Sequence, residues 1–243
     1  VQGYYARRGD LKRLSGSALR GTRLTKRASL PLVFVHRPGV RRYRWDGRRM
    51  KRAGLWSRYA RFSLHRRVRH GGHSYLVAAT GYAIRDTVAR VARRRRRPPK
   101  VGARQRWIHV DLGTQTLVAY RGDRPVYATL VSTGKRGHTT PAGLHRIHAK
   151  HVSTTMSGTD PRSGRFRVEE VPWTLFYDGS YALHGAYWHD DFGRVRSHGC
   201  TNLAPADARW LFLWTTPRVP STWHARLGTR GTWVYLSPVR TKK

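Results

Sequence analysis

One segment of the sequence combines the residue types that covalent acyl transfer requires. Cys200 is the single cysteine of the chain, and it directly follows His198 and Gly199. A second histidine, His184, precedes it by sixteen residues, at the end of an expected strand. A free thiol, with a pKa of about 8.5, is mostly protonated at neutral pH, so a cysteine nucleophile needs an imidazole that takes its proton and later returns it to a leaving amine. The pattern therefore predicts a cysteine nucleophile assisted by a histidine.

The glycine before the cysteine favours the same interpretation. Gly199 allows a tight turn, and such a turn can direct backbone N–H groups at a developing oxyanion, an effect worth about 3 kcal/mol for each donor. A lone cysteine is more often a buried, inert residue. The adjacent Gly199 and His198 reverse that expectation, and we interpret Cys200 as the nucleophile.

Zinc binding is the competing use of such side chains, because thiolate and imidazole are both zinc ligands. The candidate ligands are His184, His198, Cys200, His189, Asp190 and Asp191. The thiol mechanism leaves fewer residues unexplained, so we expect no metal at this segment. Bound-metal stoichiometry would separate the two alternatives.

Short strands separated by turns are expected to position these residues. After residue 105 the apolar pattern predicts strands at residues 107–112, 115–120, 126–132, 144–151, 172–177, 181–184 and 233–236. Residues 153–165 are polar and numerous enough for a loop that acts as a lid. One helix is expected from Pro205, because proline suits the first helical turn and Asp207 suits the helix dipole. This part of the chain is therefore predicted to be mainly β, with one main helix.

The first hundred residues show a different, more basic pattern. Residues 1–29 are expected to form a basic arm or linker, because glycines interrupt any helix there. Residues 30–97 are expected to form a small basic β-rich module with strands at 32–35, 59–64, 74–78 and 82–91, for which an SH3-like fold is one form. The arginine run at 93–97 and the prolines at 98–99 mark a boundary. A linker at 98–105, a second domain at 106–238 and a basic tail at 239–243 follow.

The net charge is strongly positive and unevenly distributed. The chain has 49 Lys+Arg against 12 Asp+Glu, which gives +37; residues 1–100 hold 29 basic and 3 acidic residues, or +26. Such a field attracts polyanions, among them nucleic acid, anionic wall polymers, lipopolysaccharide and acidic membrane surfaces. A nucleic-acid-binding protein is thus an alternative of a different class, and it predicts salt-dependent, sequence-independent binding through residues 1–100. It does not account for the pattern at 184–202.

Composition excludes several other classes. Hydrophobic residues make up 39% of the chain, which is too many for a wholly disordered protein. No window approaches 18 consecutive apolar residues, so no transmembrane segment is expected. A single cysteine cannot form an intrachain disulfide. No signal peptide is visible in a chain that begins at Val1, and one removed earlier is compatible with this start.

At these residues the sequence resembles the L,D-transpeptidase family, whose catalytic domain is of the YkuD type. That family has a histidine, a gap in the mid-teens, and then Ser/Thr-His-Gly-Cys-hydrophobic-Asn. His184 and the segment Ser197-His198-Gly199-Cys200-Thr201-Asn202 match in order and spacing, with the polar Thr201 as a small departure. Residues 132–135, 140–143 and 146–147 resemble the upstream signature of the family. The resemblance covers about residues 106–238.

The resemblance implies a YkuD-like β-sandwich with one main helix and assigns roles to the matched residues. Cys200 would be the acylated nucleophile, and His184 would be the base that activates it, with the Gly185 carbonyl holding the imidazole. The Gly199 and Cys200 amides would form part of the oxyanion hole. His198 would support the site by hydrogen bonding, and a catalytic role for it stays open.

Neighbouring side chains supply further candidates. Ser197 and Asn202 would brace the loop, as the resemblance implies. Arg196 could meet a carboxylate of a stem peptide, although a solvated loop is an equally good interpretation of it. Trp188, between the two halves of the motif, could stack on a sugar ring in the substrate cleft, although tryptophans are more often core residues.

The substrate that the resemblance implies is a peptidoglycan stem tetrapeptide. Cys200 would attack the carbonyl of the third-position diamino acid, expel the terminal D-Ala, and pass the thioester to a side-chain amine of a second stem, giving a 3→3 cross-link without a metal or organic cofactor. With water as acceptor the protein would be an L,D-carboxypeptidase, and a protein amine is a third acceptor.

The same substrate implies a periplasmic or cell-envelope location. The basic N-terminal region would bind anionic envelope polymers, and no specific nucleic-acid partner is expected. Deleting residues 1–100 should then weaken wall binding and leave turnover of a soluble stem peptide nearly intact.

Overall fold

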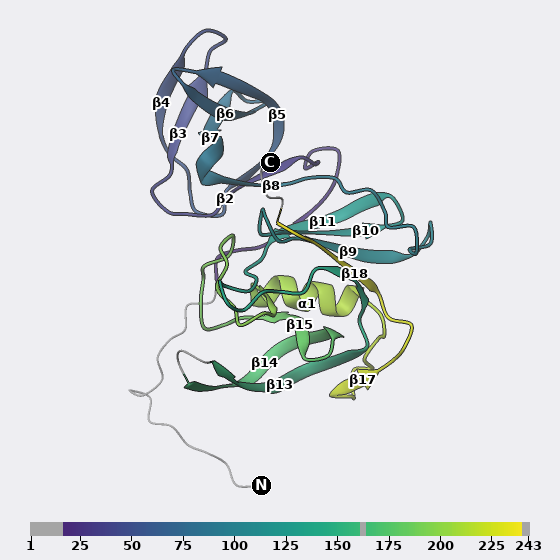
Figure 1. Ribbon diagram of the computed structural model, residues 1–243. Coiled ribbons are helices and arrows are strands. Elements are labelled where there is room, and N and C mark those ends of the chain that lie inside the picture. Colours follow the sequence, from purple (N-terminus) through teal and green to yellow (C-terminus); the bar gives the residue numbers. More distant parts are fainter. Residues whose placement is uncertain (1–16, 161–163, 240–243) are drawn as a thin grey trace.

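The computed structural model describes residues 17–160 and 164–239, which form three β-sheets and one α-helix (Figure 1). A six-stranded sheet has the order β1-β11-β10-β9-β18-β12. Its strands are β1 (Thr22–Arg23), β9 (Arg106–Asp111), β10 (Thr116–Arg121), β11 (Arg124–Leu130), β12 (Gly143–Arg146) and β18 (Trp233–Ser237). Strands β9 and β18 are parallel, and the other neighbours are antiparallel.

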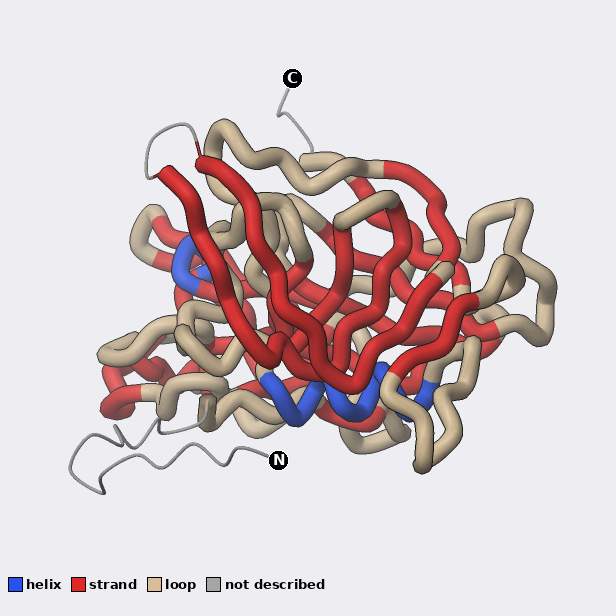
Figure 2. Tube along the Cα trace, turned by 90° about the horizontal axis from the view of Figure 1, so that it is seen from below, coloured by secondary structure: helices blue, strands red, loops and turns tan. Residues whose placement is uncertain are grey.

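A five-stranded sheet lies opposite, in the order β16-β15-β14-β13-β17. Its strands are β13 (Ala149–Asp160), β14 (Gly164–Asp178), β15 (Tyr181–Gly185), β16 (Thr201–Leu203) and β17 (Ala225–Leu227). The helix α1 (Pro205–Trp214) lies between the two sheets (Figure 1). Figure 2 shows the long strands β13 and β14 running side by side on the near side of the molecule.

Strands β9 and β10 of the six-stranded sheet are buried on both faces, which explains their nearly continuous apolar runs. Ile108 and Val110 of β9 belong to the apolar cluster that contains the buried face of α1. Trp107, on the opposite face of β9, belongs to a second cluster and stacks on Tyr120 with ring centroids 4.2 Å apart. Because successive side chains of a strand point to opposite faces, a strand covered on both sides needs apolar residues at every position.

The N-terminal part of the chain forms a seven-stranded sheet in the order β4-β3-β7-β6-β5-β2-β8. Its strands are β2 (Leu32–Val35), β3 (Arg41–Trp45), β4 (Met50–Leu55), β5 (Arg61–His70), β6 (His73–Ala78), β7 (Tyr82–Arg85) and β8 (Ala89–Ala92), with the 3-10 helix Asp86–Val88 between β7 and β8. Gly71 and Gly72, both at positive φ, make the β5–β6 turn.

The N-terminal part shares an apolar cluster with the six-stranded sheet. Leu19 and Phe34 are fully buried in this cluster together with Trp107, Val118 and other residues of that sheet. Strand β1 pairs with β11, with Thr22 opposite Ala128. Residues 17–24 of the expected basic arm or linker therefore contribute to the six-stranded sheet and its core. Residues 1–16 of that arm lie outside the described residues.

Much of the expected secondary structure is confirmed. The strand at 32–35, the 107–120 hairpin, the helix from Pro205 and the last strand all form. The mainly β class with one main helix is confirmed for the described residues. The arginine run at 93–97 makes specific contacts; for example, Arg95 donates from its backbone N–H to the Tyr120 hydroxyl at 2.9 Å.

Three expectations about local structure were wrong. Residues 153–165 are not a loop, because all but the undescribed 161–163 lie in the β13–β14 hairpin. The strand expected at 144–151 is divided between β12 and β13, which belong to different sheets. The strand expected at 82–91 is interrupted by a 3-10 turn. The hairpin was missed because much of its distal half is exposed, so its sequence lacks the apolar alternation of a half-buried strand.

No helix in the described residues is both long and apolar enough to cross a membrane.

Candidate active site

Strand pairing brings the two parts of the sequence motif together. Strands β15 and β16 are parallel neighbours, with Leu183 opposite Thr201 and His184 opposite Asn202. Side chains of register partners point to the same face of a sheet, and this direction repeats every second residue. Cys200 directly precedes β16 and is hydrogen-bonded with the Ala182 backbone of β15, two residues before His184, so the pairing brings the two parts of the motif close together.

The orientation of the His184 ring is set by its own strand. His184 is 2% exposed, and its Nδ1 lies 3.2 Å from the carbonyl oxygen of Gly185. A carbonyl oxygen can only accept, so Nδ1–H donates this bond, and the lone pair of a neutral ring is on Nε2. Burial lowers the pKa of His184 to about 4, against the opposing effect of the Gly185 bond. The imidazole is therefore neutral at pH 7 and can accept a proton.

The Cys200 thiol is partly accessible and neutral. Its Sγ lies 3.8 Å from the carbonyl oxygen of Ser180. Burial raises the pKa of the thiol, and a backbone hydrogen bond from Ala182 opposes that rise. The resting site thus combines a thiol with a neutral imidazole, so a proton must leave the sulfur as the sulfur attacks.

The turn before Cys200 is held by hydroxyl groups. Gly199 has φ +120°, and a Cβ at this position would lie 2.6 Å from Cε1 of Tyr181, so only glycine fits without a shift. Ser197 Oγ donates to the Cys200 carbonyl at 2.5 Å and accepts from the Gly199 N–H at 3.1 Å. Thr140 Oγ1 donates to the Gly199 carbonyl at 2.7 Å.

These hydrogen bonds concern the roles expected for Ser197, as a bracing residue, and for the Gly199 amide, as an oxyanion donor. Ser197 contacts the loop as a bracing residue must, and Thr140, which belongs to the upstream signature but was assigned no role from the sequence, does the same from the other side. The Gly199 N–H is already engaged by Ser197. The expected oxyanion contribution of this amide therefore conflicts with its hydrogen bond in the structure.

Asn202 is joined to a histidine that the sequence suggested only as a zinc ligand. The Asn202 amide lies 2.8 Å from His189 Nε2, and His189 Nδ1 accepts the Asp191 N–H at 3.2 Å. The atom placed next to Nε2 is the amide nitrogen Nδ2. A neutral imidazole has one donor and one acceptor nitrogen, so with Nδ1 accepting, Nε2 carries the proton, and the Asn202 amide must be turned over for its oxygen to accept that proton. Burial lowers the pKa of His189 to about 4, which keeps the ring neutral at pH 7.

His198 lies on the outer side of the loop. It is exposed, and its Nε2 lies 3.1 Å from Lys135 Nζ, which can only donate. Its ring stacks on Phe166 of β14 at 4.7 Å and meets His138 edge-on at 4.9 Å. These contacts tie His198 to the 134–140 segment and to the long hairpin, as a supporting residue would be.

The two candidates for substrate contact lie on the segment between the motif halves. Trp188 is 37% exposed, and its ring stacks on His184 with centroids 5.7 Å apart. Arg196 forms an ion pair with Asp191 at 2.7 Å between NH1 and Oδ2. The predicted substrate carboxylate would have to share Arg196 with this internal partner.

A metal centre would need a gathering of ligands that the described part of the chain does not show. Within residues 17–160 and 164–239, no three His, Cys, Asp or Glu side chains cluster as metal ligands would.

A comparison with protein families finds a match that spans the candidate site. The family model of the L,D-transpeptidase catalytic domain (YkuD) matches residues 105–236, a range that includes both His184 and Cys200. The search of curated proteins finds no match.

Several solved structures of L,D-transpeptidases are similar to this chain, at low sequence identity. A mutant of the Enterococcus faecium L,D-transpeptidase is 23% identical, over 57% of this chain and 51% of its own, with a TM-score of 0.46. An L,D-transpeptidase from Stackebrandtia nassauensis is 21% identical, over 58% and 59%, with a TM-score of 0.41. One from Mycobacterium smegmatis is 17% identical, over 92% and 93%, with a TM-score of 0.43.

The chain spans about half the length of the Enterococcus faecium protein. Its family membership rests on the 105–236 match, which covers more than half of the 243 residues. The chain belongs to the L,D-transpeptidase catalytic domain family, YkuD.

Proposed function

We propose that this protein is a cysteine-dependent L,D-transpeptidase that acts on peptidoglycan stem tetrapeptides. The observation that supports the proposal is the β15–β16 pairing, which brings Cys200, next to the start of β16, close to the strand that carries a buried, neutral His184 whose Nδ1 is held by Gly185. A nucleophile, a base and an orienting group for the base are the three parts that covalent acyl transfer needs.

The first half-reaction is acylation of Cys200. His184 Nε2 takes the thiol proton as Sγ bonds to the carbonyl carbon of the third-position diamino acid. The oxyanion of the tetrahedral intermediate is stabilised by the Cys200 N–H, since the Gly199 N–H is engaged by Ser197. The C–N bond then breaks, the imidazolium gives its proton to the departing amine, and D-Ala leaves a thioester behind.

The second half-reaction returns the thiol. The side-chain amine of another stem attacks the thioester carbonyl and loses a proton to His184. The intermediate collapses, the C–S bond breaks, and His184 returns the proton to sulfur. The product is a 3→3 cross-link, and neither a metal nor an organic cofactor takes part. If water attacks instead, the same residues perform L,D-carboxypeptidase chemistry, and a protein amine would give a protein–peptidoglycan bond.

The other site residues hold these groups in place. Ser197 and Thr140 fix the turn that presents Cys200, and Asn202 fixes the adjoining strand through His189. His198 supports the outer side of the loop through Lys135 and Phe166. Trp188 is the proposed contact for substrate next to the base, because its ring is exposed and lies against His184.

The basic N-terminal part is proposed to bind anionic polymers of the cell envelope, where the substrate is located. Strand β5 carries Arg61, Arg66 and Arg69 as exposed side chains. Closely spaced cations on one strand favour a polyanion, and such binding weakens as salt rises. Retention of the full chain on purified anionic wall polymer, measured across a salt series, tests this partner.

Product masses decide between the acceptors. The purified chain and a Cys200→Ala variant are incubated with a disaccharide-tetrapeptide. A cross-linked dimer that requires Cys200 supports the transpeptidase, and a tripeptide without dimer shows the carboxypeptidase. Unchanged substrate, with no acyl adduct on Cys200 in the intact-protein mass, would overturn the proposed function.

A further inference from the structure

The segment of residues 186–197, called here the 186–197 loop, joins β15 to the turn before Cys200. It lays Trp188 on the His184 ring and His189 on Asn202. Its inner side is tied to the end of β11, where Ser132 Oγ donates to the Asp191 carbonyl at 2.8 Å. The position of this loop therefore determines what surrounds the proposed base.

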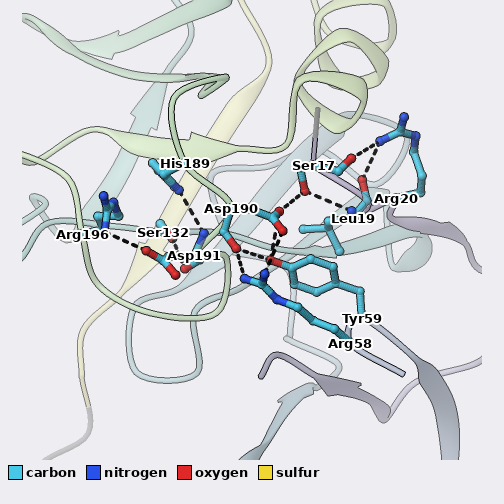
Figure 3. Close-up of polar contacts among 10 residues, drawn as sticks. All are labelled: Ser17, Leu19, Arg20, Arg58, Tyr59, Ser132, His189, Asp190, Asp191 and Arg196. Atoms are coloured by element: carbon cyan, nitrogen blue, oxygen red, sulfur yellow. Dashed lines mark hydrogen bonds and ion pairs between the residues drawn. The ribbon is translucent and has the colours of Figure 1, made fainter. Parts of the chain in front are cut away.

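Asp190, at the middle of the loop, is held by the N-terminal part of the chain (Figure 3). Arg58 NH1 lies 2.9 Å from Asp190 Oδ2, and the same guanidinium also donates to the Asp190 backbone carbonyl. The Tyr59 hydroxyl lies 3.1 Å from Asp190 Oδ1 and also contacts the backbone carbonyl. Ser17 Oγ donates to Oδ1. Three residues from outside the YkuD match thus hold both the side chain and the backbone of one loop residue.

A second attachment lies three residues further along. Arg90 Nε, from β8, donates to the Gly193 carbonyl at 2.8 Å. Gly193 has φ +93°, and a Cβ there would lie 2.6 Å from Cβ of His36. The loop backbone therefore approaches the N-terminal part as closely as a glycine allows.

Apolar packing lies beneath these polar contacts. Tyr59 and Phe34 share a buried cluster with Phe192 and Ala186 of the loop. Tyr59 is 4% exposed, although its φ is +62°, so its ring is fixed by the cluster while its hydroxyl reaches Asp190. A surface that is both apolar and hydrogen-bonded in this way resembles a domain core more than a flexible contact.

We propose that Arg58 and Tyr59 are positioning residues for the active site, and that the N-terminal part of the chain, by holding Asp190, keeps the 186–197 loop in the arrangement that covers His184 and orients Asn202. The inference rests on the proposed function for its catalytic consequence, but its structural consequence can be measured without turnover. It assigns the N-terminal part a role in the reaction beside any binding of envelope polymers.

The test uses full-length Arg58→Gln and Tyr59→Phe, with Arg58→Lys as the conservative variant. Arg67→Gln is the matched control, because it removes an ion pair to Asp86, at 2.6 Å, inside the N-terminal sheet. Three quantities are measured: hydrogen exchange of the amides of residues 187–197, the rate of Cys200 alkylation by iodoacetamide, and kcat and KM on the disaccharide-tetrapeptide.

The expected result is faster exchange in the loop, a changed alkylation rate and a kcat lowered about tenfold for Arg58→Gln, since small misplacements of catalytic groups are costly. Tyr59→Phe should show the same changes to a smaller extent. Arg58→Lys should keep most of the wild-type exchange, alkylation rate and kcat, and Arg67→Gln should match the wild type in all three. If Arg58→Gln and Tyr59→Phe leave exchange and alkylation as in the wild type, or if Arg67→Gln changes them equally, the proposal is wrong.

Turnover separates this proposal from the proposed function. If the wild type shows no turnover but Arg58→Gln still changes loop exchange and Cys200 alkylation, the positioning role stands and the proposed reaction fails. If the wild type turns over and the variants change neither exchange nor alkylation, the reaction stands and the positioning role fails.

Discussion

His184 and Asn202 are register partners in the parallel β15–β16 pair, and this relationship sets the geometry of the whole site. The proposed base, His184, lies on β15, and Asn202, two residues after the proposed nucleophile, lies opposite it on β16. The Gly185 carbonyl fixes the His184 ring from one end, and His189 fixes the Asn202 amide from the other. A shift of this register by one residue would turn one set of side chains to the opposite face.

Removing the base should be far more damaging than removing the second histidine. His184→Gln is expected to lower kcat by about 100-fold or more, the usual contribution of a general base. His198→Gln should lower it by less than about tenfold, because that ring lies against Lys135 and Phe166. Steady-state kinetics on the stem peptide check both variants. Equal losses in the two would show that the base has been assigned to the wrong histidine.

The pH dependence of Cys200 alkylation should be that of a neutral thiol and a neutral His184 imidazole. Burial raises the pKa of Cys200 and lowers that of His184 to about 4, so neither group is charged between about pH 5 and 8. The rate of Cys200 alkylation by iodoacetamide should therefore keep rising with pH to beyond 9, because only the thiolate reacts. A plateau below pH 8 would instead reveal a resident thiolate–imidazolium pair.

Mild acid should destabilise the fold. His36, His109 and His184 are buried, and burial lowers their pKa values to about 3, 4 and 4. Between these values and about 6.5 the unfolded chain binds protons that the folded chain does not, so stability falls as pH falls through this window. Each group contributes about 1 kcal/mol of loss by pH 5.5. Chemical denaturation at pH 7.0 and 5.5 measures the difference, and no change between the two would contradict neutral burial.

Gly199→Ala should disturb the site through a clash as well as through backbone strain. Gly199 and Gly47 both have a positive φ, at +120° and +104°, but a Cβ at Gly47 meets nothing within 4 Å. Gly47→Ala is therefore the control for strain alone, which costs about 1–2 kcal/mol. Gly199→Ala should lose more stability and nearly all turnover, because either Tyr181 or the Cys200 turn must move. Thermal unfolding and steady-state kinetics of the two variants check this prediction. A fully active Gly199→Ala enzyme would contradict the role of Gly199 in the turn before Cys200.

Deleting residues 1–100 should cost stability, contrary to the expectation that turnover would survive nearly intact. The deletion removes Leu19 and Phe34 from the cluster that they share with Trp107 and Val118, and so uncovers part of the six-stranded sheet. Burying one large apolar side chain contributes about 2 kcal/mol, so several exposed together should abolish a cooperative transition or cause aggregation. Calorimetry of the truncated chain measures this loss of stability, and an unchanged Tm would show that the two parts are independent.

The sequence by itself predicted the candidate reactive groups and determined much of the secondary structure. A single cysteine after His-Gly, and a histidine sixteen residues upstream, predicted both candidate groups, because few other patterns place a thiol, a tight turn and an imidazole together. Apolar runs predicted β2, β9 and β10, and Pro205 predicted the start of α1. These signals are local, since residue type and short-range periodicity carry them.

Only the tertiary structure decided which groups surround the pair. The Asp190–Arg58 contact joins residues 132 positions apart, and no periodicity marks such a contact. The β13–β14 hairpin, which supplies Phe166 to His198, is too exposed in its distal half to show an apolar alternation. Its extended form depends on pairing across the hairpin, from Gly158 with Phe166 near the turn to Ala149 with Phe176, 27 residues apart, at its base. Pairing and burial are long-range properties, so the residues that hold the loop in place and keep both proposed reactive groups neutral became visible only in the folded chain.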